Sequence, residues 1–90
     1  MECQNGTISK DLEIPDKAVE KKMVDELVVN IVNNLDTIHR EVIIYKYYYE
    51  LTDVEIASIL KIREGTVKSR LHRAKRIIKR KLEIQLKDIS

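Results

Sequence analysis

Residues 52–82 read TDVEIASILKIREGTVKSRLHRAKRIIKRKL, and this stretch decides the fold of the chain. Thr52 and Glu55 form a capping box, in which the Thr hydroxyl accepts from the Glu amide and the Glu carboxylate reaches back. Apolar residues then recur at one-face helical spacing, at Ile56, Ala57 and Leu60. Segment 61–63 breaks this period with one apolar residue between two basic ones. The pattern predicts a short helix followed by a tight turn with a buried plug.

A second helical period opens after the turn. Its apolar residues are spaced four, three, four and four apart, at Val67, Leu71, Ala74, Ile78 and Leu82. At about 100° per residue the first four fall in one narrow arc. Roughly opposite lie Gly65, Ser69, His72, Arg73, Arg76 and Arg80, with Lys68, Lys75 and Lys79 on the flank. A short helix, a turn and a longer basic helix form the layout of a helix-turn-helix DNA reader, whose second helix enters the major groove.

Length and composition limit what else the chain can be. Ninety residues make one small domain with a modest core. No apolar run is long enough to span a bilayer, and no signal peptide is visible. The lone Cys3 excludes an intramolecular disulfide, and His39 and His72 lie far apart without companion ligands. We therefore expect a reduced, cytoplasmic protein without membrane contact, metal or other cofactor. We also expect no enzymatic activity, because no nucleophile set, carboxylate pair or glycine-rich phosphate loop is present.

Charge divides the chain into two unlike parts. Residues 1–60 carry six Lys and Arg against twelve Asp and Glu, whereas residues 61–90 carry eleven against three. Such asymmetry indicates a nucleic-acid surface in the second part. A solvated basic face would be the alternative, but these cations share a helix with a clean apolar stripe.

The remaining segments complete an all-α domain of four helices. Residues 1–13 are polar and without period, which predicts a flexible leader ahead of a domain at 14–90. The expected helices are about 16–33, 36–48, 53–60 and 64–84. In the first, Val19, Met23, Leu27 and Ile31 form a fourfold stripe beside Val24, Val28 and Val32. The tyrosines at 45, 47, 48 and 49 are expected to pack the end of the second helix over the core rather than to stack on single-stranded nucleic acid.

A longer series of residues resembles a known family. Leu35, REVIIYKY at 40–47, LT at 51–52, EIA at 55–57 and GTVKSRLHRAK at 65–75 are similar to region 4 of the extracytoplasmic-function (ECF) sigma factors of the sigma-70 family. The resemblance covers roughly residues 15–82. It implies a domain of the winged-helix-like DNA-binding superfamily that recognises the double-stranded minus-35 element of promoters. It also implies docking on the β-subunit flap of RNA polymerase core, and in some cases masking by an anti-sigma factor.

The resemblance also implies roles for individual residues. The positions that match the family's base-reading face are Lys68, Ser69, His72 and Arg73. Positions near the DNA backbone are Thr66, Arg70 and Arg76, and Thr52, Arg63 and Lys79 are further candidates for phosphate contacts. Arg and Lys suit guanine O6 and N7, whereas hydroxyls and the remaining cations suit phosphates.

Three positions depart from the family pattern. Lys61 and Glu50 stand where glycine or another residue at ease with positive φ is usual, and Lys61 would cost about 1 kcal/mol in an unchanged turn. Arg63 replaces the common Ser at the start of the second helix and loses a cap worth about 1 kcal/mol.

Two alternatives to a sigma factor domain that reads promoter DNA are open, one with a different partner and one from a different class of regulator. The chain could be a protein-interaction module that binds an anti-sigma factor or polymerase through helix 14–34 and uses no DNA. It could also be a LuxR-type output domain, although the uninterrupted basic helix argues against this. A complete ECF sigma factor has an upstream region 2 that ninety residues do not contain. We therefore expect an isolated region 4 rather than a stand-alone protein, binding promoter DNA weakly and unable to start transcription alone.

Overall fold

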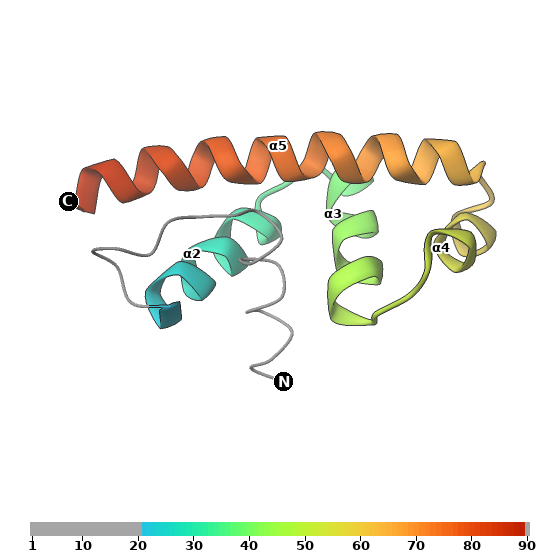
Figure 1. Cartoon of the computed structure of the whole chain (residues 1–90), viewed down its shortest axis with the longest axis horizontal. Coiled ribbons are helices and arrows are strands. Elements are labelled where there is room, and N and C mark those ends of the chain that lie inside the picture. Colours follow the sequence, from blue (N-terminus) through green and yellow to red (C-terminus); the bar gives the residue numbers. More distant parts are fainter. Residues whose placement is uncertain (1–20, 90) are drawn as a thin grey trace.

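The computed structural model describes residues 21–89, and every element in that part of the chain is a helix (Figure 1). The α-helices are α2 (Lys21–Asn33), α3 (Thr37–Ile43), α4 (Asp53–Leu60) and α5 (Glu64–Ile89), and α3 continues into a π-helical segment η1 (Ile44–Tyr48). The predicted all-α class with four helices is confirmed. The expected leader at 1–13 and the expected start of the first helix near residue 16 lie outside the described residues.

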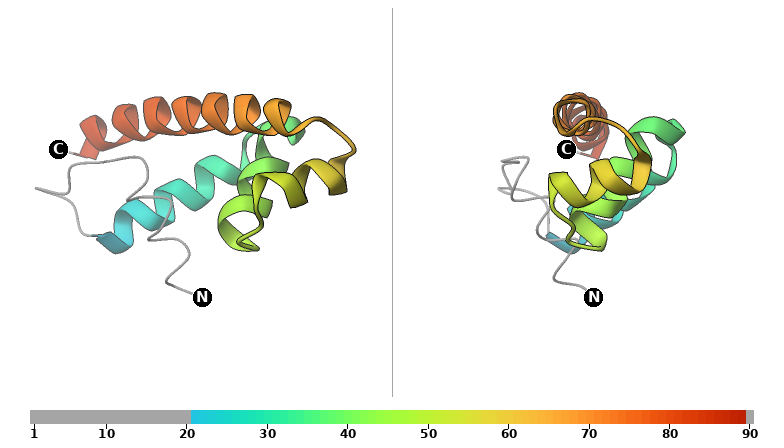
Figure 2. Two further views of the ribbon diagram at one scale, coloured as in Figure 1. Left: turned by 45° about the vertical axis from the view of Figure 1, so that its right-hand side comes forward. Right: turned by 90° about the vertical axis from the view of Figure 1, so that its right-hand side faces the viewer.

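Helix α5 runs the length of the domain and the other helices gather on one side of it. It has 26 residues, ends five residues beyond the expected position near 84, and is about 39 Å long at 1.5 Å per residue. Helices α2, α3 and α4 all pack against it (Figures 1 and 2). Seen along its axis, α5 therefore has one covered face and one open face.

The core lies between α5 and the shorter helices. The five apolar residues predicted to anchor α5 are all buried, at Val67, Leu71, Ala74, Ile78 and Leu82. They meet buried residues of the other elements, at Val24, Val28, Ile31, Val32, Leu35, Val42, Ile43, Tyr47, Ile56 and Ala57. In α2 the valine stripe is the buried one, while Met23 is 38% exposed. The expected fourfold stripe is therefore only partly in the core.

The second expected helix is not a uniform α-helix. It changes to π-helical hydrogen bonding after Ile43, where the Tyr49 N–H donates to the Ile44 carbonyl five residues back at 3.1 Å. Tyr47 is buried, and Tyr45 and Tyr48 pack against the core at its rim. Burial raises the pKa of the Tyr48 hydroxyl. The prediction that the tyrosines pack on the core is confirmed for these three residues, whereas Tyr49 is exposed.

Two residues have left-handed backbone conformations at positions where the family usually has glycine. Glu50 has a φ of 57° ahead of α4, and Lys61 has a φ of 59° in the turn between α4 and α5. After Lys61 the Ile62 N–H donates to the Ala57 carbonyl at 3.0 Å, which closes the end of α4. The turn therefore keeps the geometry that usually takes glycine, with a lysine in its place.

Replacing Lys61 with Gly should raise the free energy of unfolding by about 1 kcal/mol, because glycine adopts positive φ without the Cβ clash. The measurement is urea denaturation followed by circular dichroism. Lys61→Ala is the matched control, since it removes the same charge but keeps the Cβ. Equal stability of the two variants would show that the turn is not strained.

Candidate nucleic-acid interface

The helix-turn-helix unit is fixed by hydrogen bonds at both ends of α4. The predicted capping box is present, with the Thr52 N–H donating to Glu55 Oε1 at 2.8 Å and the Glu55 N–H donating to Thr52 Oγ1 at 3.1 Å. Lys46 Nζ on η1 lies 3.1 Å from Asp53 Oδ1 and ties the start of α4 to the preceding element. At the other end Ile62 packs against the core, as expected for the plug of the turn. These contacts set the direction in which α5 leaves the turn.

All ten residues predicted to contact DNA lie at the surface, nine of them between the turn and the middle of α5. Two of them are half-buried, Thr66 and Arg70. The other eight are exposed: Thr52, Arg63, Lys68, Ser69, His72, Arg73, Arg76 and Lys79. At about 100° per residue, the four predicted base-reading residues span one side of α5, with Lys68 and His72 towards one flank and Arg73 towards the other. The structure therefore brings them onto one continuous open face.

Lys68 has a partner within its own helix. Its Nζ lies 3.5 Å from Glu64 Oε2, and both side chains are largely exposed. Exposed pairs of this kind contribute little to stability. A nucleic-acid ligand could therefore displace Glu64 from Lys68 with little loss.

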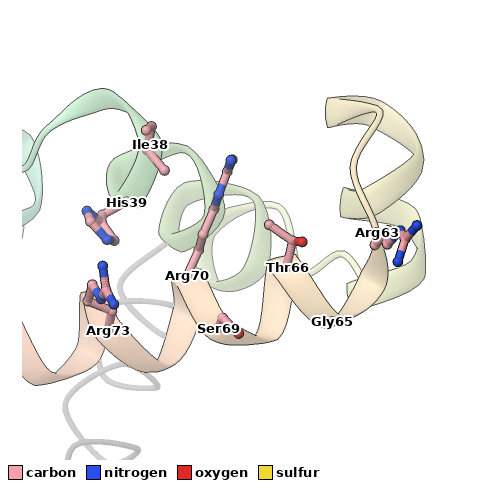
Figure 3. A pocket seen from close by; sticks show the side chains of 8 residues that line it. All are labelled: Ile38, His39, Arg63, Gly65, Thr66, Ser69, Arg70 and Arg73. Carbon is pink, nitrogen blue, oxygen red and sulfur yellow. The ribbon is translucent and has the colours of Figure 1, made fainter.

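A hollow of about 670 Å³ opens on the Arg73 side of α5. Figure 3 shows the residues that line it, which come from α3, the turn and α5: Ile38, His39, Arg63, Gly65, Thr66, Ser69, Arg70 and Arg73. Three arginines, a histidine and two hydroxyl groups face this space, and none of the lining residues is acidic. The composition suits a ligand that carries negative charge.

Besides Gly65, two of the lining residues were not predicted as part of a site. Ile38 and His39 come from α3, more than twenty residues before the turn, and only the packing of α3 against α5 brings them there. His39 points towards Arg73 in Figure 3. In the sequence His39 has no companion ligands, and no spacing connects it with α5.

Gly65 lies on the same open face, at the start of α5, and lines the hollow. Its φ is not positive, and a Cβ added at this residue would meet no atom within 4 Å. The packing of the described residues therefore does not require glycine at this position. A backbone that comes close to an external group would require it.

A second hollow continues the basic surface along α5. It is lined by Arg73, Arg76, Ile77, Lys79, Arg80 and Glu83. Arg76 and Lys79 were predicted as phosphate contacts, whereas Arg80 was placed on the polar face without a role. The cationic surface thus extends well past the turn.

Other kinds of site find little support in the described part of the chain. Residues 21–89 hold no group of three His, Cys, Asp or Glu side chains placed to bind a metal ion. Within the same residues, no helix combines the length and the apolar character needed to cross a membrane.

The four helices, the capped turn and the open basic face of α5 define a helix-turn-helix domain of the DNA-binding kind. A family model described as Sigma-70, region 4 matches residues 25–78, which extend from α2 into the middle of α5. The chain therefore belongs to the sigma-70 region 4 family, whose members are transcription factors and not enzymes. The resemblance to region 4 of an ECF sigma factor is confirmed, and with it a DNA-binding role.

One relative shows how the chain compares in length with a whole sigma factor. The chain is 35% identical over 69 residues to the ECF RNA polymerase sigma factor SigW of Bacillus subtilis (strain 168), an alignment that covers 77% of this chain and 37% of that protein. The chain thus spans less than half the length of this relative. No solved structure gives a significant match.

Proposed function

We propose that this chain recognises the minus-35 element of bacterial promoters as region 4 of an ECF sigma factor, and so helps to direct RNA polymerase to promoters in the cytoplasm. The observation that carries the proposal is the division of α5 into two faces. Its apolar stripe is buried from Val67 to Leu82, while the opposite face from Gly65 to Arg80 is exposed and basic. A helix held in this way can enter the major groove, which is wide enough to admit it.

Base reading is assigned to the first half of the open face. Arg73 and Lys68 can donate to guanine O6 and N7, and Ser69 and His72 lie between them with groups that can donate or accept. These residues begin one turn after the start of α5, where helix-turn-helix proteins place their base contacts. Specificity would then depend on four side chains of one helix.

Backbone contacts are assigned to the surrounding residues. Arg63, Thr66 and Arg70 flank the base-reading residues near the turn, and Arg76 and Lys79 follow them along α5. The Thr52 hydroxyl already accepts from the Glu55 amide, but its own hydrogen can still be donated to a phosphate. Such contacts fix the register of the protein on the duplex without reading sequence.

Protein partners follow from the family and not from a surface of this chain. The resemblance implies docking on the β-subunit flap of the polymerase core and, in some sigma factors, masking by an anti-sigma factor. The alternative of a module that binds protein through helix 14–34 without DNA has weak support. In the described part of that helix, Val24, Val28, Ile31 and Val32 are buried inside the domain. The LuxR alternative required a break after the recognition helix, and α5 has none from Glu64 to Ile89.

Arg73→Ala should reduce the binding free energy for the preferred duplex by about 1–3 kcal/mol and relax the preference at one base pair. The preferred duplex would come from selection on a random pool, and affinity would be measured by fluorescence anisotropy for all single-base variants. Lys79→Ala is the matched comparison, because it should weaken all sequences about equally and lower the salt slope by about one. An unchanged base profile for Arg73→Ala would remove this residue from the reading face.

A further inference from the structure

The hollow beside the first half of α5 lies where a DNA strand should pass. The major groove is about 12 Å wide and a helix with its side chains is about 10–12 Å across, so the phosphates of the two strands run along the flanks of an inserted helix. Arg63, Thr66 and Arg70 occupy one flank and line the hollow. On the far wall of that hollow is His39, which belongs to α3.

We infer that His39 is a ligand for one DNA backbone phosphate, which it holds together with Arg70, and that Asp36 positions its ring. The inference rests on the proposed DNA-binding function and extends it to a residue outside the helix-turn-helix unit. It would make α3, and not only α4 and α5, part of the DNA interface.

The geometry of the ring supports this role. His39 Nδ1 lies 2.7 Å from Asp36 Oδ1. A carboxylate can only accept, so Nδ1 carries the hydrogen and donates it, which leaves Nε2 as the ring nitrogen available to the hollow. The hydrogen bond from His39 lowers the pKa of the Asp36 carboxyl. The His39 side chain is 14% exposed, so packing as well as this hydrogen bond holds the ring in place.

The charged groups around His39 favour the binding of an anion in the hollow. Arg70 and Arg73 line the same hollow from α5, and Asp36, which directly precedes α3, pairs with the ring. The charge of Lys81, further along α5, also lowers the pKa of Asp36. The last turn of α2 carries no charged side chain, and its Asn33 carbonyl accepts a hydrogen bond from Arg40. Lys46 on η1 is paired with Asp53. A phosphate bound by Arg70 and His39 would offset this positive charge and favour the protonated ring.

The contact between His39 and the phosphate should therefore be strongest when the ring is protonated. Acid pH favours the imidazolium form of histidine, whose Nε2–H can donate to a phosphate. Charge-assisted hydrogen bonds to phosphate are stronger than neutral ones. The contribution of His39 to affinity should accordingly be larger at pH 6 than at pH 8.

The test uses the full chain and the preferred duplex selected from a random pool, with affinity measured at pH 6 and pH 8. His39→Gln should weaken binding at pH 6 roughly five- to tenfold, by a similar factor for every sequence, and have a much smaller effect at pH 8. His39→Lys, which keeps the positive charge at both pH values, should restore affinity and remove this pH dependence. His72→Gln removes the other histidine and is the control, since the His39-dependent pH effect should persist in it.

A scan with single methylphosphonate substitutions, which neutralise one phosphate at a time, identifies the partner. One substitution should weaken the wild type but not His39→Gln. Thermal melts of each variant exclude unfolding as the cause. If the wild type binds the duplex and loses affinity with Arg73→Ala, yet His39→Gln binds normally and no phosphate depends on it, the inference is wrong and the proposed function stands. If the wild type binds no duplex at all, both are wrong.

Discussion

Ile78→Ala should lower the free energy of unfolding by about 2–5 kcal/mol, which is among the largest stability changes expected for a single substitution in this chain. Ile78 is fully buried on α5, beneath the exposed basic face. Removing three carbons there loses apolar burial and leaves a cavity that helices packed on one side of α5 can only partly close. A domain of this size has only about 5–15 kcal/mol of stability, so the loss would be evident in urea denaturation.

Ile84→Ala is the control for this prediction. It removes the same atoms from the same helix, but Ile84 is 56% exposed and should cost on the order of 0.5 kcal/mol. A comparable loss in both variants would mean that the two faces of α5 are not distinct. Because the DNA-binding proposal depends on one anchored and one open face, that result would count against it as well.

The structural features that depend on short-range sequence patterns were predicted correctly. The apolar stripe of α5, the capping box at Thr52 and the plug at Ile62 each follow from spacings of three to five residues, and all are present. In these cases a short-range preference and the tertiary packing favour the same conformation, so a reading of the sequence succeeds.

Features that depend on tertiary contacts were missed. His39 joins the hollow only because α3 crosses α5, and no short-range pattern relates residues separated by that distance. The change to π-helix at Ile44 is a choice between hydrogen-bond partners that apolar spacing does not reveal. In α2 the sequence offered two apolar stripes, and the helices packed against it decide that the valine stripe is buried and Met23 is not.

Raising the salt concentration from 50 to 200 mM should weaken duplex binding on the order of a hundredfold, the largest effect expected on binding. Each phosphate neutralised by a cation contributes a slope of about −0.9 to the dependence of log affinity on log salt. The cations assigned to backbone contacts number four, at Arg63, Arg70, Arg76 and Lys79. Together they predict a slope of about −3.6, to be measured by fluorescence anisotropy across a salt series.

This slope also separates the proposed function from the alternative of a protein-interaction module, because an apolar interface would not weaken steeply with salt. The double variant Arg76→Gln with Lys79→Gln should reduce the slope by about two, since it removes two of the assigned contacts. Lys87→Gln, near the far end of α5, makes the same kind of charge change without touching an assigned contact and should leave the slope unchanged. If Lys87→Gln lowered the slope as much per charge as the double variant, affinity would reflect the net charge of the chain and not an ordered track of phosphates along α5. The division of α5 into reading and anchoring faces would then explain its stability but not its binding.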